Sequence, residues 1–165
     1  MAYNAASIAN FFLDQADEEG AYIDPMKLQK LLYYANGWWA GEYREPLIAE
    51  PVEAWKYGPV FPSIYREFQG FKGNPITSRA RKRNTLFSKT REEPVLEDED
   101  TKRFLKRIWT KYGRMRSMTL SDMTHAPGGP WDIVREDNPD KSSVVIPLDV
   151  IADHFAEALN SARAA

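Results

Sequence analysis

The side chains that could perform catalysis lie close together in one short stretch. Ser121, Asp122 and His125 fall within five residues, and Ser121 and His125 are four apart, which places them on one helical face. A hydrolase triad needs its base and its orienting acid from separate elements, together with an oxyanion hole. No G-x-S-x-G turn surrounds the serine. We therefore expect His125 to cap carbonyls at a helix end, and we predict that the protein is not an enzyme.

Metal-binding and nucleotide-binding signals are absent from the sequence. The chain has no cysteine and two histidines, so thiolate ligands, disulfides and a multi-histidine metal site are not expected. The segment Gly70-Phe71-Lys72-Gly73 lacks the length and the final Lys-Ser/Thr of a P-loop. We expect neither a metal nor a cofactor.

A run of basic residues is the clearest sign of an electrostatic partner. Residues 72–91 contain no acid, and four of their cations form a candidate patch: Arg79, Arg81, Lys82 and Arg83. Clustered cations can neutralise phosphates, which makes a nucleic-acid-binding regulator one alternative. An acidic protein partner is a second. The third and simplest is a solvated hairpin or loop, balanced by the acidic residues of 92–100, and the net charge of −2 does not favour nucleic acid.

Length and hydropathy indicate a small globular protein. A chain of 165 residues can form one domain with its own core, and we expect a single domain over residues 1–165, with its core at about 4–159. The longest uncharged run, residues 1–13, is too short to cross a bilayer and has no basic residue before it. We therefore expect a cytoplasmic protein without a membrane partner.

Aromatic residues are abundant, with five tryptophans and eight tyrosines. Such side chains fill cores, and Trp and Tyr are also common anchors of binding surfaces because each carries a polar group. Tyr57, Tyr65 and Trp131 stand near proline-rich turn segments, so we expect these three to be partly exposed.

The strongest helical pattern in the chain lies at residues 24–40. Asp24 suits the N-cap and Pro25 the first helical position. Apolar residues then recur on one wide face: Leu28, Leu31, Leu32, Ala35 and Trp39. Polar residues occupy the remainder: Lys27, Gln29, Lys30 and Asn36. So wide an apolar face predicts a central helix that is contacted from more than one side.

Capping residues and apolar periodicity predict further helices. They lie at residues 5–16 with Asn4 as N-cap, 62–69, from the acidic residues of 92–100 to Tyr112, 119–125, and 147–159. The spacing from Thr119 to Asp122 suggests a capping box for the fourth of these.

Short β segments and turns complete the expected scaffold. Residues 52–55 suit a loop or a short edge strand, and 144–146 suit a strand. Gly58-Pro59 indicates a turn, and 127–130 a loop that delivers Trp131. We predict a mainly α fold of five or six helices around residues 24–40, with a small β hairpin or sheet.

Three separated motifs resemble those of the Panacea (SocA-like) antitoxin domain, a family also described as phage-associated protein. The first is the helix Asp24–Ala35, DPMKLQKLLYYA. The second is Glu53–Val60 with Pro62, Tyr65 and Phe68. The third is Leu120-Ser121 with Thr124-His125 and Pro130-Trp131. They follow the family's order, and the resemblance covers nearly the whole chain.

The resemblance implies an antitoxin of a toxin–antitoxin system that binds and neutralises a cognate protein toxin. Some members are adaptors that deliver the toxin to an ATP-dependent protease, which is an alternative function with the protease as a further partner. Many longer members carry a DNA-binding domain, which we do not expect here. The motif positions supply the candidate partner-binding residues, which either bind the toxin or fold the domain: Trp55, Tyr57, Gly58, Pro59, Tyr65, Thr124, His125 and Trp131.

Overall fold

The computed structural model describes residues 2–83 and 91–164, with the side chains of residues 82, 83 and 91 left outside that description. Its α-helices are α1 (Ala5–Glu19), α2 (Pro25–Tyr43), α3 (Pro62–Phe68), α4 (Glu99–Tyr112), α5 (Ser117–Thr124), α6 (Pro130–Asp137) and α7 (Leu148–Ala164), and a 3-10 turn, η1, spans Gln69–Phe71. Its strands are β1 (Glu53–Trp55), β2 (Gly58–Val60), β3 (Lys82–Arg83), β4 (Arg91–Glu92) and β5 (Val144–Val145). The predicted mainly α fold is confirmed.

Local capping chemistry fixes where the first two helices begin. The Asn4 side chain accepts a hydrogen bond from the amide of Ala6 at 2.8 Å, and Asp24 does the same for Lys27 at 2.8 Å. Both predicted N-caps are therefore confirmed. α2 continues beyond its expected end at residue 40 and closes at Arg44, whose φ of 58° is left-handed.

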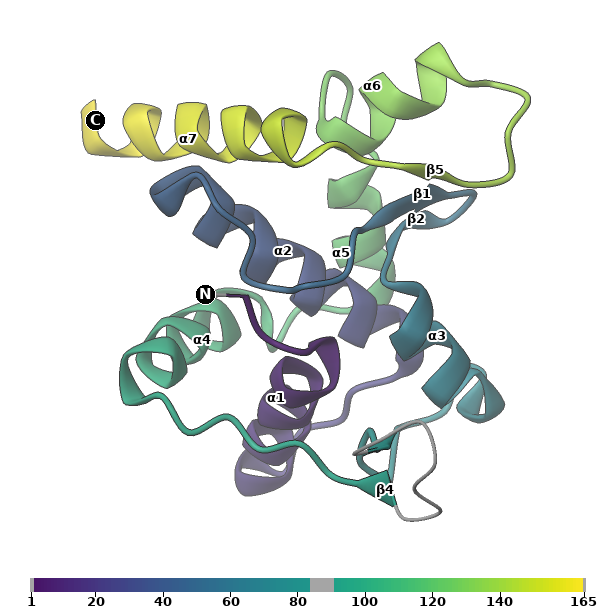
Figure 1. Ribbon diagram of the computed structural model, residues 1–165, viewed down its shortest axis with the longest axis vertical. Coiled ribbons are helices and arrows are strands. Elements are labelled where there is room, and N and C mark those ends of the chain that lie inside the picture. Colours follow the sequence, from purple (N-terminus) through teal and green to yellow (C-terminus); the bar gives the residue numbers. More distant parts are fainter. Residues whose placement is uncertain (1, 84–90, 165) are drawn as a thin grey trace.

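α2 is the central helix of the fold, as predicted. It contacts α1, α3, α4, α5, α7 and β2, and Figure 1 shows α7 on one side of it and α1 and α4 on the other. The polar residues that were expected to occupy its remaining face are buried as well: Lys27, Gln29, Lys30 and Asn36. From Lys27 to Gly37 the helix is thus buried on all sides, and its polar groups there must find partners within the protein.

Two of these buried side chains bind the backbone of neighbouring loops. Asn36 accepts hydrogen bonds from the amides of Leu47 and Ile48 at 3.0 and 3.1 Å. Gln29 accepts from the amide of Phe61 at 2.8 Å and donates to its carbonyl at 3.2 Å. A buried amide left without a partner costs about 1–3 kcal/mol, so these pairs hold the segments before and after the hairpin in one position.

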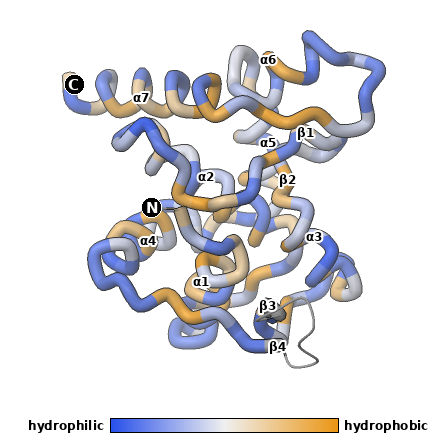
Figure 2. The backbone as a smooth tube through the Cα atoms, in the orientation of Figure 1, coloured by the Kyte–Doolittle hydropathy of each residue, from blue (hydrophilic) through white to orange (hydrophobic). Residues whose placement is uncertain are grey.

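A three-stranded antiparallel sheet lies beside α2 in the order β2-β1-β5. β1 is its central strand, so the expectation of an edge strand or loop at 52–55 is wrong. Trp55 pairs with Gly58, which places the two-residue turn at Lys56-Tyr57 and corrects the expected turn at Gly58-Pro59. Figure 2 shows a hydrophilic loop between α6 and β5, whereas β5 and the segment after it are hydrophobic.

The segment from α5 to α6 differs from the prediction in two ways. Arg116, and not Thr119, is the N-cap of α5, and the hydroxyl of Ser117 binds the Asp24 carboxylate and so ties the start of α5 to that of α2. Pro130 opens a further helix, α6, because its fixed φ suits the first helical position. Residues 127–129 form the expected loop, and Trp131 lies on this helix, which the sequence did not predict.

α7 crosses α2 at two glycines. A Cβ atom at Gly37 would lie 2.2 Å from the ring of Phe155, and one at Gly41 would lie 2.8 Å from the backbone nitrogen of Ala156. Phe155 itself is buried against Tyr33, Tyr34 and Trp38. The closeness of the two helices thus depends on the absence of side chains at residues 37 and 41.

We expect Gly41→Ala to lower the free energy of unfolding by about 1–3 kcal/mol, because the new methyl group meets backbone that cannot rotate away. A helical Gly→Ala exchange ordinarily stabilises by up to about 1 kcal/mol, so the predicted sign is reversed. Urea unfolding measures the change. Gly70→Ala, where no atom lies within 4 Å of the new Cβ, is the control and should have little effect. A Gly41→Ala protein as stable as the parent would contradict the prediction.

Candidate functional site

The candidate partner-binding residues converge on the hairpin formed by β1 and β2. Tyr65 of α3 packs edge-on against Trp55, with ring centroids 4.9 Å apart. On the opposite side Trp131 donates its indole N–H to the carbonyl of Trp55 at 2.6 Å, and the ring of His125 lies 4.1 Å from that of Trp131. Residues from four separated segments are therefore brought together around one hairpin.

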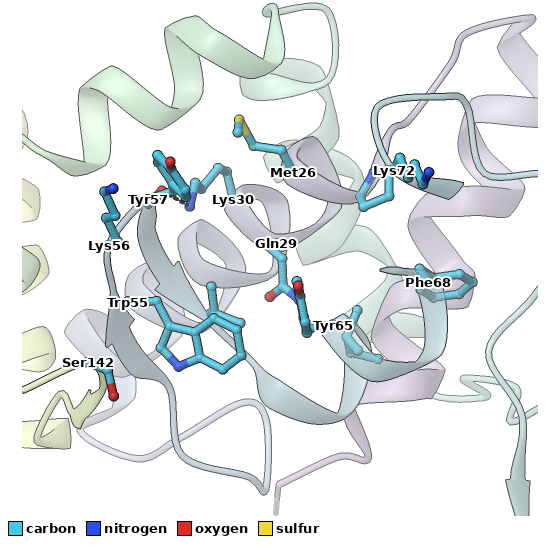
Figure 3. A pocket seen from close by; sticks show the side chains of 13 residues that line it. Met26, Gln29, Lys30, Trp55, Lys56, Tyr57, Tyr65, Phe68, Lys72 and Ser142 are labelled. Atoms are coloured by element: carbon cyan, nitrogen blue, oxygen red, sulfur yellow. Dashed lines mark hydrogen bonds between the residues drawn. The ribbon is translucent and has the colours of Figure 1, made fainter. Parts of the chain in front are cut away.

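A groove of about 440 Å³ lies between the hairpin, α3 and the first turns of α2. We call it the hairpin groove, and Figure 3 shows the side chains that line it. Its lining is largely apolar and aromatic: Met26, Trp55, Val60, Ile64, Tyr65 and Phe68. Lys30, Lys56 and Lys72 also line it. Pockets of about 300–1,000 Å³ with such walls are typical of binding sites.

The three aromatic side chains that were expected to be partly exposed are so. Tyr57 is 66% exposed and Tyr65 is 42% exposed, and Trp131 is half-buried. Trp55 is half-buried too, and its indole N–H donates to the carboxylate of Glu53 at 3.0 Å. Large aromatic side chains beside a groove supply apolar contact area without an unsatisfied polar group.

Three candidate residues are buried and can act only through the shape of the hairpin. They are Gly58, Pro59 and Thr124. Gly58 has a φ of 116°, which L side chains rarely adopt, and a Cβ there would lie 2.5 Å from Nζ of Lys30 and 3.1 Å from the hydroxyl of Thr124. Glycine at this position thus lets the hairpin lie directly on α2 and α5.

Lys30, on α2, holds the hairpin by hydrogen bonds to its backbone. Its ammonium group donates to the carbonyl of Tyr57 at 3.0 Å and to that of Pro59 at 3.4 Å, and the residue is 2% exposed. Burial lowers the pKa of Lys30 to about 8 from its ordinary 10.5. No carboxylate among the described residues forms an ion pair with it. The hairpin is therefore held by a cation whose partners are backbone dipoles.

The arrangement at Ser121 and His125 differs from that of a nucleophile and its base. Nδ1 of His125 lies 2.6 Å from the carbonyl oxygen of Ser121, so the ring donates to the backbone at the end of α5. The Ser121 hydroxyl is buried and lies 3.4 Å from the carbonyl of Tyr57. The expected capping role of His125 is confirmed.

The described part of the basic stretch lies near acidic side chains. Arg79 pairs with Asp14 at 2.7 Å and with Asp17, and both carboxylates belong to α1. Nε of Arg81 lies 3.7 Å from a carboxylate oxygen of Glu93, in the acidic block that follows. The side chains of Lys82 and Arg83, and all of residues 84–90, lie outside the described residues. Of the four candidate cations, the two whose side chains are described, Arg79 and Arg81, thus lie beside carboxylates.

Neither a metal-ligand cluster nor a membrane-spanning helix is present in residues 2–83 and 91–164. Within them, no three side chains of His, Asp or Glu are grouped as they would be around a metal ion. Nor is any helix there both long and apolar enough to cross a membrane.

Sequence reasoning missed most of the groove, because only Trp55, Tyr57 and Tyr65 of its lining residues were candidates. Met26, Lys30, Ile64, Phe68 and Lys72 line it but were not candidates. The helical pattern assigns Lys30 to the polar face of the central helix, and Phe68 was named only as part of the second motif. The one available signal was their sequence proximity to the hairpin motif and to the start of the central helix.

Comparison with known proteins identifies the family of the chain. The model of the family described as "Antitoxin SocA-like, Panacea domain" matches residues 28–132. The chain belongs to this SocA-like Panacea antitoxin family. A curated relative, Antitoxin SocA of Caulobacter vibrioides (strain NA1000 / CB15N), is 36% identical over 131 residues, which cover 79% of this chain and 70% of the relative. No solved structure matches.

The matched region contains most of the groove, and only Pro25, Met26 and Ser142 of its lining lie outside it. It begins at Leu28 on α2 and ends at Asp132, and so includes the hairpin, α3 and α5. The resemblance inferred from the three motifs is thereby confirmed, and family membership supports an antitoxin role.

The pKa of Lys30 gives a pH dependence of stability. Between about pH 8 and 10.5 the unfolded chain binds a proton that folded Lys30 has released, so the free energy of unfolding rises with pH in this window, by at most about 3 kcal/mol. Burial raises the pKa of Tyr33 and Tyr34, so above about pH 10 these tyrosines lower stability again.

We therefore expect the stability difference between the parent and Lys30→Met, measured by urea unfolding from about pH 7.5 to 9.5, to shift in favour of the parent as pH rises. The variant removes the titrating group, so effects of other residues cancel. A difference that stays constant over this range would contradict the lowered pKa.

Proposed function

We propose that this protein is the antitoxin of a toxin–antitoxin system, and that it neutralises a cognate protein toxin by binding it at the hairpin groove. The observation that carries the proposal is a groove with exposed aromatic side chains inside the region matched by the SocA-like Panacea family. Occlusion of a toxin requires a surface and no catalytic group, which suits this site.

The candidate residues divide into two roles under this proposal. Trp55, Tyr57 and Tyr65 contact the toxin, because they line the groove and two of them are well exposed. Tyrosine and tryptophan give large contact areas with few rotatable bonds, which is why they dominate binding energies at interfaces.

The remaining candidates shape the site. Gly58, Pro59 and Thr124 set the path of β2 over α2 and α5, and His125 and Trp131 support the hairpin from the other side. Under the proposal, each motif residue is thus assigned either to binding the partner or to folding the domain.

Co-expression tests the proposal. The open reading frame beside this gene is induced alone and then together with this protein, with growth and co-purification as readouts. Toxicity alone, rescue together and a co-eluting complex support direct neutralisation. Rescue with loss of the toxin indicates delivery to a protease, and a toxin that is never rescued refutes the proposal.

Exchange of the exposed tyrosines tests the site. We expect Tyr57→Ala and Tyr65→Ala each to weaken toxin binding about tenfold to a hundredfold, with little change in Tm, because each removes an exposed contact and leaves the core intact. Isothermal titration and thermal unfolding measure the two effects. Tyr22→Ala is the matched control, since Tyr22 is 76% exposed and lies outside the hairpin groove. Unfolding of both hairpin variants would assign these residues to the fold.

A further inference from the structure

The hairpin groove combines apolar walls with positive charge. Three lysines line it, and none of the described lining residues is acidic. Glu53, whose carboxylate accepts from the indole of Trp55, lies outside the lining. The groove is therefore locally cationic, although the chain as a whole carries a net charge of −2.

Two of the lysines lie at opposite ends of the groove. Figure 3 shows Lys56 beside the hairpin turn and Lys72 beyond α3, with Trp55 and Tyr65 between them. Both are exposed, and among the described residues neither forms an ion pair. The Lys56 ammonium lies 5.4 Å from the centre of the Tyr57 ring. Their charges are thus available to a ligand that spans the groove.

Lys72 occupies a backbone conformation that is unfavourable for lysine. Its φ is 55° and its ψ is −115°, a region that glycine adopts far more readily than residues with a Cβ. The strained residue is thus one whose side chain lines the end of the groove. A glycine there would relax the loop but would remove the charge.

The third lysine of the lining, Lys30, is buried beneath the hairpin. Lys30 keeps its two described hydrogen bonds on the carbonyls of the hairpin, and it has no carboxylate partner among the described residues. An anionic group that enters the groove would find this partly compensated cation behind the aromatic walls. Electrostatic attraction is stronger for Lys30 than at an open surface, because a buried charge is screened less by water.

We propose that the groove binds an acidic segment of the toxin, with an apolar side chain held between Trp55, Ile64 and Phe68 and carboxylates placed against Lys56 and Lys72. The inference rests on the proposed antitoxin function and adds the chemistry of the partner. A nucleic acid fits less well, because none of the described lining residues is arginine, and Trp55 and Tyr65 pack on one another instead of standing free for bases.

A displayed library of random short peptides tests this chemistry without knowledge of the toxin. The purified chain of 165 residues should enrich sequences that combine Asp or Glu with Leu, Phe or Trp. The affinity of an enriched peptide should fall about tenfold or more when its acids are changed to Asn and Gln. Enrichment of neutral or basic peptides, or no enrichment, overturns the proposal.

Charge reversal identifies the site of binding. Lys56→Glu combined with Lys72→Glu should weaken the enriched peptide about tenfold or more and should reduce the salt dependence of its affinity. Lys106→Glu combined with Arg107→Glu changes the net charge equally on exposed positions of α4 and should alter the affinity less than about twofold. Equal effects of the two pairs overturn the assignment to the groove.

The variant Lys72→Gly distinguishes the effect of Lys72 on peptide affinity from its effect on stability. It should raise the urea midpoint, because it relieves the backbone, and at the same time weaken the peptide severalfold. A variant that gains stability and binds as tightly as the parent overturns the role of Lys72.

Other occupants give distinct results. Oligonucleotide that competes with the peptide, or a concentration-dependent dimer that is abolished by Tyr65→Ala, would refute an acidic protein segment as the occupant. Co-expression with the toxin distinguishes a failure of the acidic-partner proposal from a failure of the proposed function. Rescue that survives the double charge reversal but is lost in Tyr57→Ala overturns the acidic partner and leaves the proposed function standing.

Discussion

Hydrogen bonds from buried polar side chains of α2 to loop backbone are the interaction on which this structure depends. Gln29 holds Phe61, Lys30 holds Tyr57 and Pro59, and Asn36 holds Leu47 and Ile48. α1 uses the same device at Asn10, which exchanges two bonds with the backbone of Ala80. Irregular segments can thus lie against the core with their polar groups satisfied. The hairpin groove depends on one of these contacts, because Lys30 holds the hairpin that forms one of its walls.

Local chemistry made the helical scaffold predictable. Asn4 and Asp24 cap the helices they were expected to cap, Pro62 opens α3, and α4 ends at Tyr112 as expected. These features depend on neighbours in sequence, so a short window contains the decisive information. The start of α5 shows the converse, because it is set by a contact from Ser117 to the distant Asp24.

Within the hairpin groove, the sequence predicted only the exposure of side chains that lie near proline and glycine turns. Tyr57 and Tyr65 were expected at the surface and lie there, whereas the burial of Lys30 and Gln29 was not expected. A periodic pattern assigns such residues to a solvated face, and only the packing of the hairpin onto α2 places them inside. The turn at Lys56-Tyr57 was missed for a related reason, since strand register with β1 outweighs the local signal of Gly58-Pro59. That the chain forms a single domain remains a prediction.

The crossing of α7 over Gly37 and Gly41 has a consequence for synthesis on the ribosome. Phe155, which covers the tyrosines of α2, is made more than a hundred residues after Gly41, and β5 is also a late addition to the sheet. At translation rates of about 5–20 residues per second, this interval is roughly 5 to 20 s. During it the glycine face of α2 has no cover and the long-range contacts cannot form. The time needed to complete the core thus sets an earliest moment for the finished fold after each round of translation.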